Sequence, residues 1–172
     1  MNKGIIKSVQ SFLLNQQTSD MKHLKVGDAA PAFEAVNEKG EKVKLADFKG
    51  KKLALFFYPA DNTPGCTAEA CSLRDYYAEL KQKGVEVLGV SPDSEKKHQG
   101  FIKKYNFPFS LLADTDLTIL NDYGVWGLKK FMGREFDGVH RTTFLIDENG
   151  NIEQIIEKVD TANHAAQLLG LV

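Results

Sequence analysis

Residues 52–75, KLALFFYPADNTPGCTAEACSLRD, decide the fold, because they join a buried strand to the start of a long helix. The run at 52–58 is mostly apolar and ends at Pro59, a pattern typical of a strand buried on both faces of a sheet. From 68 to 83 apolar residues recur with helical spacing, and the apolar run at 85–90 predicts a second buried strand. A strand, a helix and a strand in this order predict a right-handed βαβ unit.

The segments on either side add strands and helices to this unit. They predict a hairpin of strands at 33–36 and 42–45, a helix from Ser94 to Tyr105, a strand at 109–112, a short helix at 118–123, a hairpin of strands at 142–147 and 152–157, and a closing helix at 161–169. This order fits a thioredoxin-like α/β fold, with a central mixed sheet flanked by helices and an N-terminal β-hairpin. No internal repeat or linker divides residues 21–172, so we expect one domain there.

The first twenty residues carry only a weak amphipathic pattern. Three interpretations of residues 1–20 remain open: a short docking helix, a helix that mediates self-association, or sequence from upstream of the natural start. The segment lacks the long apolar core and the small-residue cleavage site of a secretory signal. We expect residues 1–20 to be a dispensable N-terminal extension.

The composition argues against several classes of protein. The chain has 172 residues, of which 42% are hydrophobic and 26% charged, so wholesale disorder is excluded. A net charge of -1 without a long Lys/Arg run argues against a nucleic-acid or anionic-membrane partner. No stretch approaches the roughly 18 apolar residues of a membrane span. Two cysteines are too few for a disulfide-rich secreted scaffold, so we expect a reducing, cytoplasmic location.

Cys66 follows the first long strand, at the start of the predicted helix. Ligand sites in open α/β sheets lie at the carboxyl ends of strands, and a helix N-terminus offers unpaired N–H groups and a positive dipole end. Thiols at such positions have pKa values of about 3.5–7.5 instead of about 8.5, which favours the nucleophilic thiolate at neutral pH. The alternative is that Cys66 is a small buried hydrophobic residue.

Two sequence blocks together resemble a known family. The pattern Pro59-x-x-x-Thr63-x-x-Cys66 matches the active site of peroxiredoxins, and the fuller run FFYPADNTPGCTAEACSLRD is similar to their bacterioferritin-comigratory-protein subfamily. A second block, YGVWGLKKFMGR at 123–134 followed by GVHRTTFLID at 138–147, agrees. The resemblance covers residue 22 to the C-terminus and implies a thiol-specific peroxidase that needs no metal or organic cofactor.

The resemblance also implies roles for individual residues. Cys66 would be the peroxidatic thiolate, which attacks the O–O bond of hydrogen peroxide or an organic hydroperoxide and becomes a sulfenic acid. Thr63 would hydrogen-bond the thiolate and the peroxide, and Arg141 would stabilise negative charge on both. The backbone N–H groups of Gly65 and Cys66 would bind the peroxide, and Pro59 would shield the site from water.

Three further residues receive roles from the same resemblance. Tyr58 and Phe57 would line the site. Cys71 resembles the resolving cysteine of subfamily members that carry it in the same helix, and it would attack the Cys66 sulfenic acid to form an intramolecular disulfide. Thioredoxin or a similar dithiol protein would reduce that disulfide. If Cys71 is instead a core cysteine, the mechanism uses one cysteine or an outside thiol. With either role of Cys71, the expected assembly is a monomer or a weak homodimer.

Several residues near the site have alternative interpretations. Arg141 begins the Thr143 and Leu145 face of a predicted interior strand, although an arginine on a strand is more often a surface residue. Glu69 and Arg74 are candidates to support the site or to form an exposed helix face.

Histidines and large apolar residues elsewhere carry no clear chemical signal. Trp126 and Met132 are expected to be packing residues. The four histidines are scattered without the spacing of metal ligands, which argues against a zinc site: His23, His98, His140 and His164.

Two other functions compete with a peroxidase. A disulfide oxidoreductase of the thioredoxin type shows C-x-x-C, whereas this chain has C-x-x-x-x-C between Cys66 and Cys71. A redox sensor would use oxidation of Cys66 to signal to a partner protein. Insulin reduction identifies the first alternative, and rapid peroxide turnover with thioredoxin argues against the second.

Overall fold

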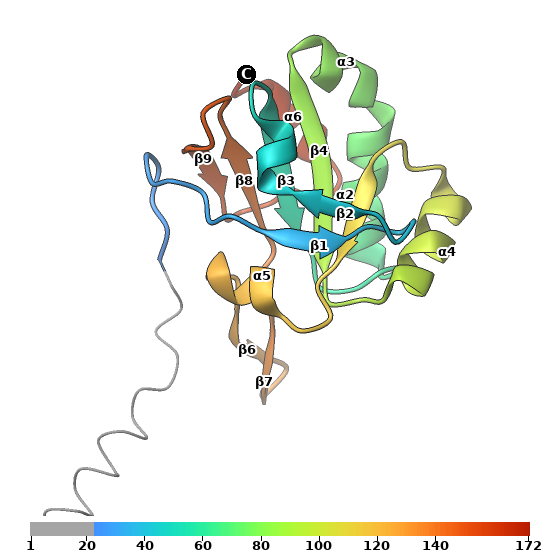
Figure 1. Cartoon of the computed structure of the whole chain (residues 1–172). Helices are drawn as coiled ribbons and strands as arrows, with labels where there is room; N and C mark the ends of the chain where they lie inside the picture. Colours follow the sequence, from blue (N-terminus) through green and yellow to red (C-terminus); the bar gives the residue numbers. More distant parts are fainter. Residues whose placement is uncertain (1–22) are drawn as a thin grey trace, which may run out of the picture.

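A five-stranded mixed sheet forms the centre of the molecule, in the order β5-β4-β3-β8-β9 (Figure 1). The computed structural model describes residues 23–172, so the predictions for residues 1–20 lie outside the described residues. β4 pairs in parallel with β3 and β5, whereas β8 runs antiparallel to β3 and β9. The strands are β3 (Lys52–Phe57), β4 (Val85–Ser91), β5 (Ser110–Ala113), β8 (Thr142–Ile146) and β9 (Ile152–Ile156).

Four helices cover one face of this sheet. Alternate residues of β3, Ala54 and Phe56, point to that face and pack in one buried cluster with apolar residues of the helices. Each large apolar side chain buried there stabilises the fold by roughly 1.5–3 kcal/mol. None of the helices in the described part of the chain is both long and apolar enough to cross a membrane. The four are α2 (Pro64–Asp75), α3 (Tyr77–Gln82), α4 (Glu95–Tyr105) and α6 (His164–Leu169).

The other face is covered by the N-terminal hairpin and a short helix. Leu53, Leu55 and Phe57 of β3 point to this second face, so the strand is buried on both sides as its sequence predicts. The hairpin that the sequence predicts is confirmed, and the mixed sheet between two covering layers confirms the expected fold class. The covering elements are β1 (Glu34–Val36), β2 (Lys42–Lys44), the 3-10 helix η1 (Leu45–Phe48) and α5 (Thr118–Asp122).

The single helix expected at 68–83 is wrong in its bounds. The structure has two helices there, because the chain leaves helical geometry at Tyr76, with φ -112° and ψ 17°. Tyr76 is 48% exposed, whereas Tyr77 packs on the helix-covered side. The apolar spacing continues across the break, so the pattern alone does not reveal it. α2 also begins earlier than expected, at Pro64, since a proline is well placed in the first turn of a helix.

A second hairpin, β6 (Trp126–Phe131) with β7 (Arg134–Val139), is absent from the sequence prediction. It projects from the body of the molecule in Figure 1. Its two-residue turn is Met132-Gly133, with φ 49° and 75°, so both residues have the positive φ of a type I′ turn. Met132 is 86% exposed, and the expectation that it is a packing residue is wrong. Trp126 does pack against the core, as expected.

Candidate active site

Cys66 lies in the first turn of α2, where the sequence predicts it. Thr63 precedes the helix in an extended conformation, with φ -84° and ψ 153°. Its carbonyl oxygen accepts the hydrogen bond of the Thr67 N–H at 2.9 Å, which closes the first turn. The Cys66 side chain is 1% exposed and packs in the cluster on the helix-covered face. The thiol therefore lies at the positive end of the helix, screened from bulk water.

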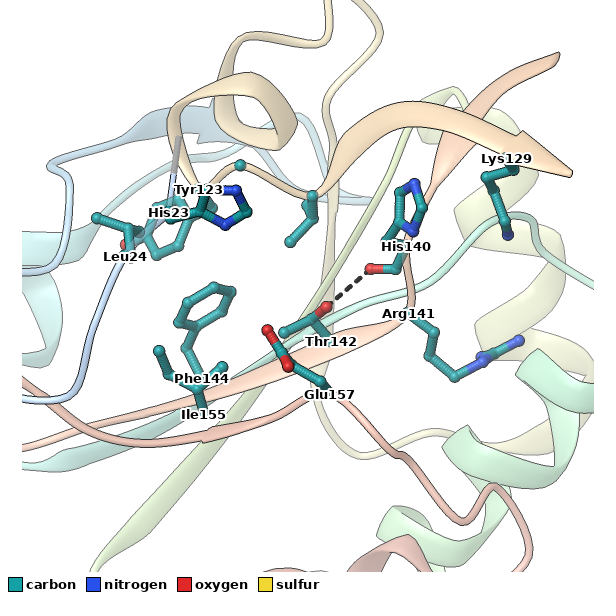
Figure 2. A pocket seen from close by; sticks show the side chains of 12 residues that line it. His23, Leu24, Tyr123, Lys129, His140, Arg141, Thr142, Phe144, Ile155 and Glu157 are labelled. Atoms are coloured by element: carbon teal, nitrogen blue, oxygen red, sulfur yellow. Dashed lines mark hydrogen bonds between the residues drawn. The ribbon is translucent and has the colours of Figure 1, made fainter. Parts of the chain in front are cut away.

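Arg141 reaches the thiol because β8 is antiparallel to β3. In this register Thr142, the first residue of β8, pairs with Phe57, the last residue of β3, so Arg141 lies beside the loop that leads to α2. Its Nη2 lies 3.4 Å from the Sγ of Cys66. Figure 2 shows its side chain extending from the start of β8 toward the helices. The expectation that Arg141 shares a face with Thr143 is met.

Glu69 holds the other side of the guanidinium. Its Oε2 accepts a hydrogen bond from Nη1 of Arg141 at 2.5 Å, and the side chain is fully buried. Burial raises the pKa of Glu69 to about 7, against the opposing effect of Arg141. Burial also lowers the pKa of Arg141, but the charges of Glu69 and Cys66 outweigh this and raise it. The arginine therefore stays charged, and it contacts a carboxyl group with one arm and a thiol with the other.

His164 closes the far side of Glu69. Its Nε2 lies 3.7 Å from Oε1 of Glu69, an oxygen that has no hydrogen-bond partner among the described residues. Thr143 Oγ1 is 2.8 Å from the same Nε2, and Nδ1 faces Oε1 of Gln167 at 2.8 Å. Burial lowers the pKa of His164, which favours the neutral ring. Within the part of the chain that the structure describes, Arg141 is therefore the residue that presents a full positive charge to this carboxyl group.

Three residues of the loop before α2 and of its first turn were predicted to belong to the site: Pro59, Thr63 and Gly65. The Thr63 hydroxyl donates to the carbonyl oxygen of Ala60 at 2.8 Å. A Cβ on Gly65 would lie 3.2 Å from Nη2 of Arg141, so a side chain there would crowd the guanidinium. Pro59 is half-buried at the start of the loop.

Tyr58 and Phe57 point to opposite faces of the sheet, as neighbours on a strand do. Tyr58 belongs to the same buried cluster as Cys66, and its hydroxyl donates to Asp61 at 2.6 Å. Phe57 packs on the other face, against Tyr123 and Phe144. The structure thus brings Tyr58, and not the Phe57 side chain, to the side of the sheet that holds the thiol.

Cys71 is partly buried in α2 and packs against the same cluster, and both cysteines are free thiols. Five residues along an α-helix rotate by about 500° and rise about 7.5 Å, so the two side chains point about 140° apart. A disulfide needs Cα atoms about 4.4–6.8 Å apart with facing Cβ vectors. The two thiols therefore cannot bond while α2 is intact.

Lys129 is a neighbour of the site that the sequence analysis does not single out, because its strand β6 is not predicted. Its Nζ donates to the carbonyl oxygen of Val139 at 2.9 Å. Burial lowers its pKa, and Arg141 lowers it further while Cys66 opposes. Lys129 and Arg141 border a pocket of about 430 Å³, whose other side includes Phe144 and Glu157 (Figure 2). The block that carries the resemblance spans this residue and is the only sequence signal for it.

Other candidates lie apart from the thiol. Arg74 donates to the carbonyl oxygen of Tyr105 and pairs with Asp75, so it does not support the site. Among residues 23–172, no group of three or more His, Cys, Asp or Glu side chains is arranged to hold a metal ion.

A buried thiol at a helix N-terminus, contacted by an arginine that directly precedes β8, defines a class of cysteine-based peroxidases. Comparison with known proteins agrees: a match to the AhpC/TSA family covers residues 26–155, and the chain belongs to that family. Within it, the chain is 47% identical to peroxiredoxin Bcp of Escherichia coli over 144 residues, which are 84% of this chain and 92% of that protein.

Two solved structures are similar as well. Peroxiredoxin Q (PrxQ) of Xylella fastidiosa has a TM-score of 0.81 at 30% identity and covers 87% of this chain and 95% of its own. The bacterioferritin comigratory protein of Xanthomonas campestris has a TM-score of 0.76 at 33% identity and covers 80% of this chain and 88% of its own. The protein is thus a peroxiredoxin of the Bcp type, a thiol peroxidase with a thioredoxin-like fold.

Proposed function

We propose that this peroxiredoxin reduces hydrogen peroxide and organic hydroperoxides to water and alcohols through Cys66. The observation that supports this most is the 3.4 Å contact between Nη2 of Arg141 and Sγ of Cys66 at the start of α2. A guanidinium beside the sulfur can stabilise negative charge that develops during the reaction, and its second arm is fixed by Glu69. The bacterioferritin comigratory protein of Xanthomonas campestris is described by its alkyl peroxide reduction activity, which supports the extension to organic hydroperoxides.

In the first step the Cys66 thiolate attacks one peroxide oxygen. An S–O bond forms, the O–O bond breaks, and the leaving oxygen takes a proton and departs as water or an alcohol. Arg141 stabilises the negative charge that develops on the leaving oxygen. The product on the enzyme is the sulfenic acid of Cys66.

The remaining loop residues position the peroxide. The hydroxyl proton of Thr63 is directed to Ala60, so its oxygen presents lone pairs and would accept the O–H of the peroxide. The backbone N–H groups of Gly65 and Cys66 lie in the unpaired first turn of α2 and would donate to the peroxide oxygens. Pro59 would limit the access of water, and Tyr58 would support the loop from the same face of the sheet.

In the second step Cys71 resolves the sulfenic acid. Its thiolate attacks Sγ of Cys66, water leaves, and an intramolecular disulfide forms. Since α2 keeps the two side chains apart, at least its first turns must unwind for this step. A thioredoxin-type dithiol would then reduce the disulfide and become oxidised itself. We place this cycle in the cytoplasm, where such dithiols are kept reduced, in a monomer or weak homodimer.

The test measures peroxide consumption by stopped flow, with thioredoxin, its reductase and NADPH supplied. Turnover of hydrogen peroxide and of an alkyl hydroperoxide is expected. In a separate assay without thioredoxin, insulin reduction by the peroxiredoxin alone should be weak. Intact mass after one equivalent of peroxide should show the loss of two hydrogens from one chain. A mass that instead gains one oxygen and keeps it would contradict the role of Cys71, and no turnover with any dithiol would contradict the peroxidase.

A further inference from the structure

Three buried polar side chains tie the loop before α2 to elements deeper in the molecule. Asp61 lies in that loop, and its side chain is 2% exposed. Its Oδ1 accepts a hydrogen bond from Oη of Tyr58 at 2.6 Å, and its Oδ2 lies 2.7 Å from Nδ1 of His98. His98, on α4, is fully buried, and its Nε2 lies 2.9 Å from the carbonyl oxygen of Leu112 on β5. We refer to Tyr58, Asp61 and His98 as the loop clamp.

The contact between Asp61 and His98 contains a shared proton. The carbonyl oxygen of Leu112 can only accept, so Nε2 of His98 carries a hydrogen. The 2.7 Å contact between Nδ1 and Oδ2 then requires a second hydrogen, because the neutral ring would have a lone pair at Nδ1 and a carboxylate has only acceptors. The pair is either imidazolium with carboxylate or imidazole with carboxylic acid. Both forms are neutral overall and fully hydrogen-bonded, as deep burial demands.

The backbone of the loop is fixed at the same residue. The N–H of Asp61 donates to Oδ2 of Asp93 at 2.8 Å, and this oxygen also accepts from Oγ of Ser91 at 2.8 Å. Asn62 follows with φ 60°, a left-handed conformation that asparagine adopts more readily than most other non-glycine residues. The next residue, Thr63, is the N-cap of α2. The position of Asp61 therefore determines where the helix that carries Cys66 begins.

We infer that Asp61 and His98 are positioning residues of the peroxidase centre, and that their buried proton-sharing contact holds the loop so that α2 presents Cys66 to Arg141. The inference rests on the proposed function for its kinetic consequence. No hydrogen bond among the described residues joins the clamp to the thiol, so the clamp acts through the backbone. The clamp fixes the loop that precedes α2, so its loss should slow the oxidation of Cys66. The resolution step should not slow, because the disulfide forms only after the first turns of α2 unwind.

The first pair of variants tests the contact from the loop side. Asp61→Asn keeps an oxygen for Tyr58 and supplies an amide N–H to Nδ1 of a neutral His98, whereas Asp61→Ala removes both hydrogen bonds. We expect Asp61→Ala to lower the second-order rate constant for peroxide by about 10–100-fold, since small misplacements of reacting groups cost this much. The second-order rate constant of Asp61→Asn for peroxide should stay within about 3-fold of the wild-type value. Asp122→Ala, at an exposed position of α5, is the matched control and should react as wild type.

The second pair of variants, at His98 on α4, distinguishes a role in positioning the loop from a role in packing alone. An asparagine at 98 can place its amide near the position of Nδ1, and a glutamine near the position of Nε2. His98→Asn therefore keeps the bond to Asp61, and His98→Gln keeps the bond to Leu112, while both lose the imidazole ring. We expect His98→Gln to react about 10-fold more slowly than His98→Asn. A role in packing alone would slow both variants alike, and that result would overturn the inference.

Two further measurements keep the inference distinct from the proposed function. Alkylation of Cys66 by iodoacetamide, in a Cys71→Ser background, reports the presentation of the thiol without any peroxide chemistry, and it should follow the same order of variants. The rate of disulfide formation after oxidation should be unchanged or faster in His98→Gln. If wild type turns over no peroxide, the proposed function fails. If wild type turns over peroxide but His98→Gln and Asp61→Ala match it while folded, the clamp is refuted.

Discussion

Nη2 of Arg141 lies 3.4 Å from Sγ of Cys66, while Nη1 of the same side chain binds Glu69. The two arms of one planar group thus meet a thiol and a carboxyl group that lie three residues apart on one helix. A buried guanidinium held from one side in this way is already oriented when negative charge develops on the other side.

Replacing the thiol should abolish activity. In Cys66→Ser the hydroxyl is not ionised at neutral pH and is a far poorer nucleophile, so stopped-flow peroxide consumption is expected to fall to the buffer rate. Cys71→Ser is the matched control, because it makes the same chemical change on the same helix. That control should still consume one equivalent of peroxide and gain one oxygen. Turnover by Cys66→Ser would mean that the nucleophile is another residue.

Arg141→Lys should keep the charge but lose the fork that binds two acceptors at once. We expect the rate of Cys66 oxidation to fall about 10–1000-fold, as for the loss of one preorganised donor. The rate of Cys66 alkylation at neutral pH should fall as well. Arg74→Lys, which lies on α2 away from the thiol, is the control. An unchanged rate constant for Arg141→Lys would show that Arg141 has only a structural role.

Glu69 should make the stability of the protein depend on pH. Burial raises its pKa from 4.5 to about 7 in the folded state, so between these values the folded protein holds a proton that the unfolded chain has released. The stability from this group is present in full below about pH 4.5 and is lost as the pH rises through about 7. The slope is at most about 1.4 kcal/mol per pH unit.

Glu69→Gln should remove this slope, as measured by urea unfolding across that pH window. Glu79→Gln, on the exposed surface of α3, makes the same change in solvent and should keep the wild-type slope. Equal slopes for wild type and Glu69→Gln would show that the carboxyl group does not take up the proton.

The oxidised protein should lose helical protection in α2. Because the two cysteines cannot bond on an intact helix, amide hydrogen exchange in peptides spanning 62–80 should be faster in the disulfide form than in the reduced form. The break at Tyr76 separates α3 from α2, so protection around buried Leu80 should persist. Equal protection of α2 in both forms, with the disulfide confirmed by mass, is the outcome that contradicts this prediction.

Removal of residues 1–20 should leave activity and thermal stability nearly unchanged. The segment lies outside the described residues, and its sequence carries no motif tied to the site. The comparison is between the melting temperature and the peroxide rate constant of the full chain and of a protein that starts at Met21. A large drop in melting temperature would show that the segment docks on the domain.

The sheet and its covering helices could be predicted from the sequence because each has a strong local period. β3, for example, is mostly apolar. The β6–β7 hairpin could not be predicted, since its turn has methionine where asparagine or aspartate normally supplies a positive φ. Its strands are also largely exposed, so no alternation marks a buried face.

The candidate site likewise contains residues that could be predicted from the sequence and residues that could not. The helix start around Cys66 is local chemistry and was predictable, and the partnership with Arg141 follows once β8 is placed beside β3. Glu69 could be named only as one of two options, because its burial depends on Arg141 and His164, which lie 72 and 95 positions away. The clamp between Asp61 and His98 is likewise a contact across 37 positions that no local pattern encodes.

The exposure of Met132 at the tip of the β6–β7 hairpin affects any oxidation experiment on this protein. The residue is 86% exposed, and peroxide converts exposed thioethers to the sulfoxide without help from an enzyme. A sulfoxide and a sulfenic acid each add one oxygen to the chain, so they have the same intact mass. The sulfenic acid is lost on treatment with a thiol such as dithiothreitol, whereas the oxygen of a methionine sulfoxide persists. A Met132→Leu chain would remove the contribution of Met132 from the count of oxygens on Cys66.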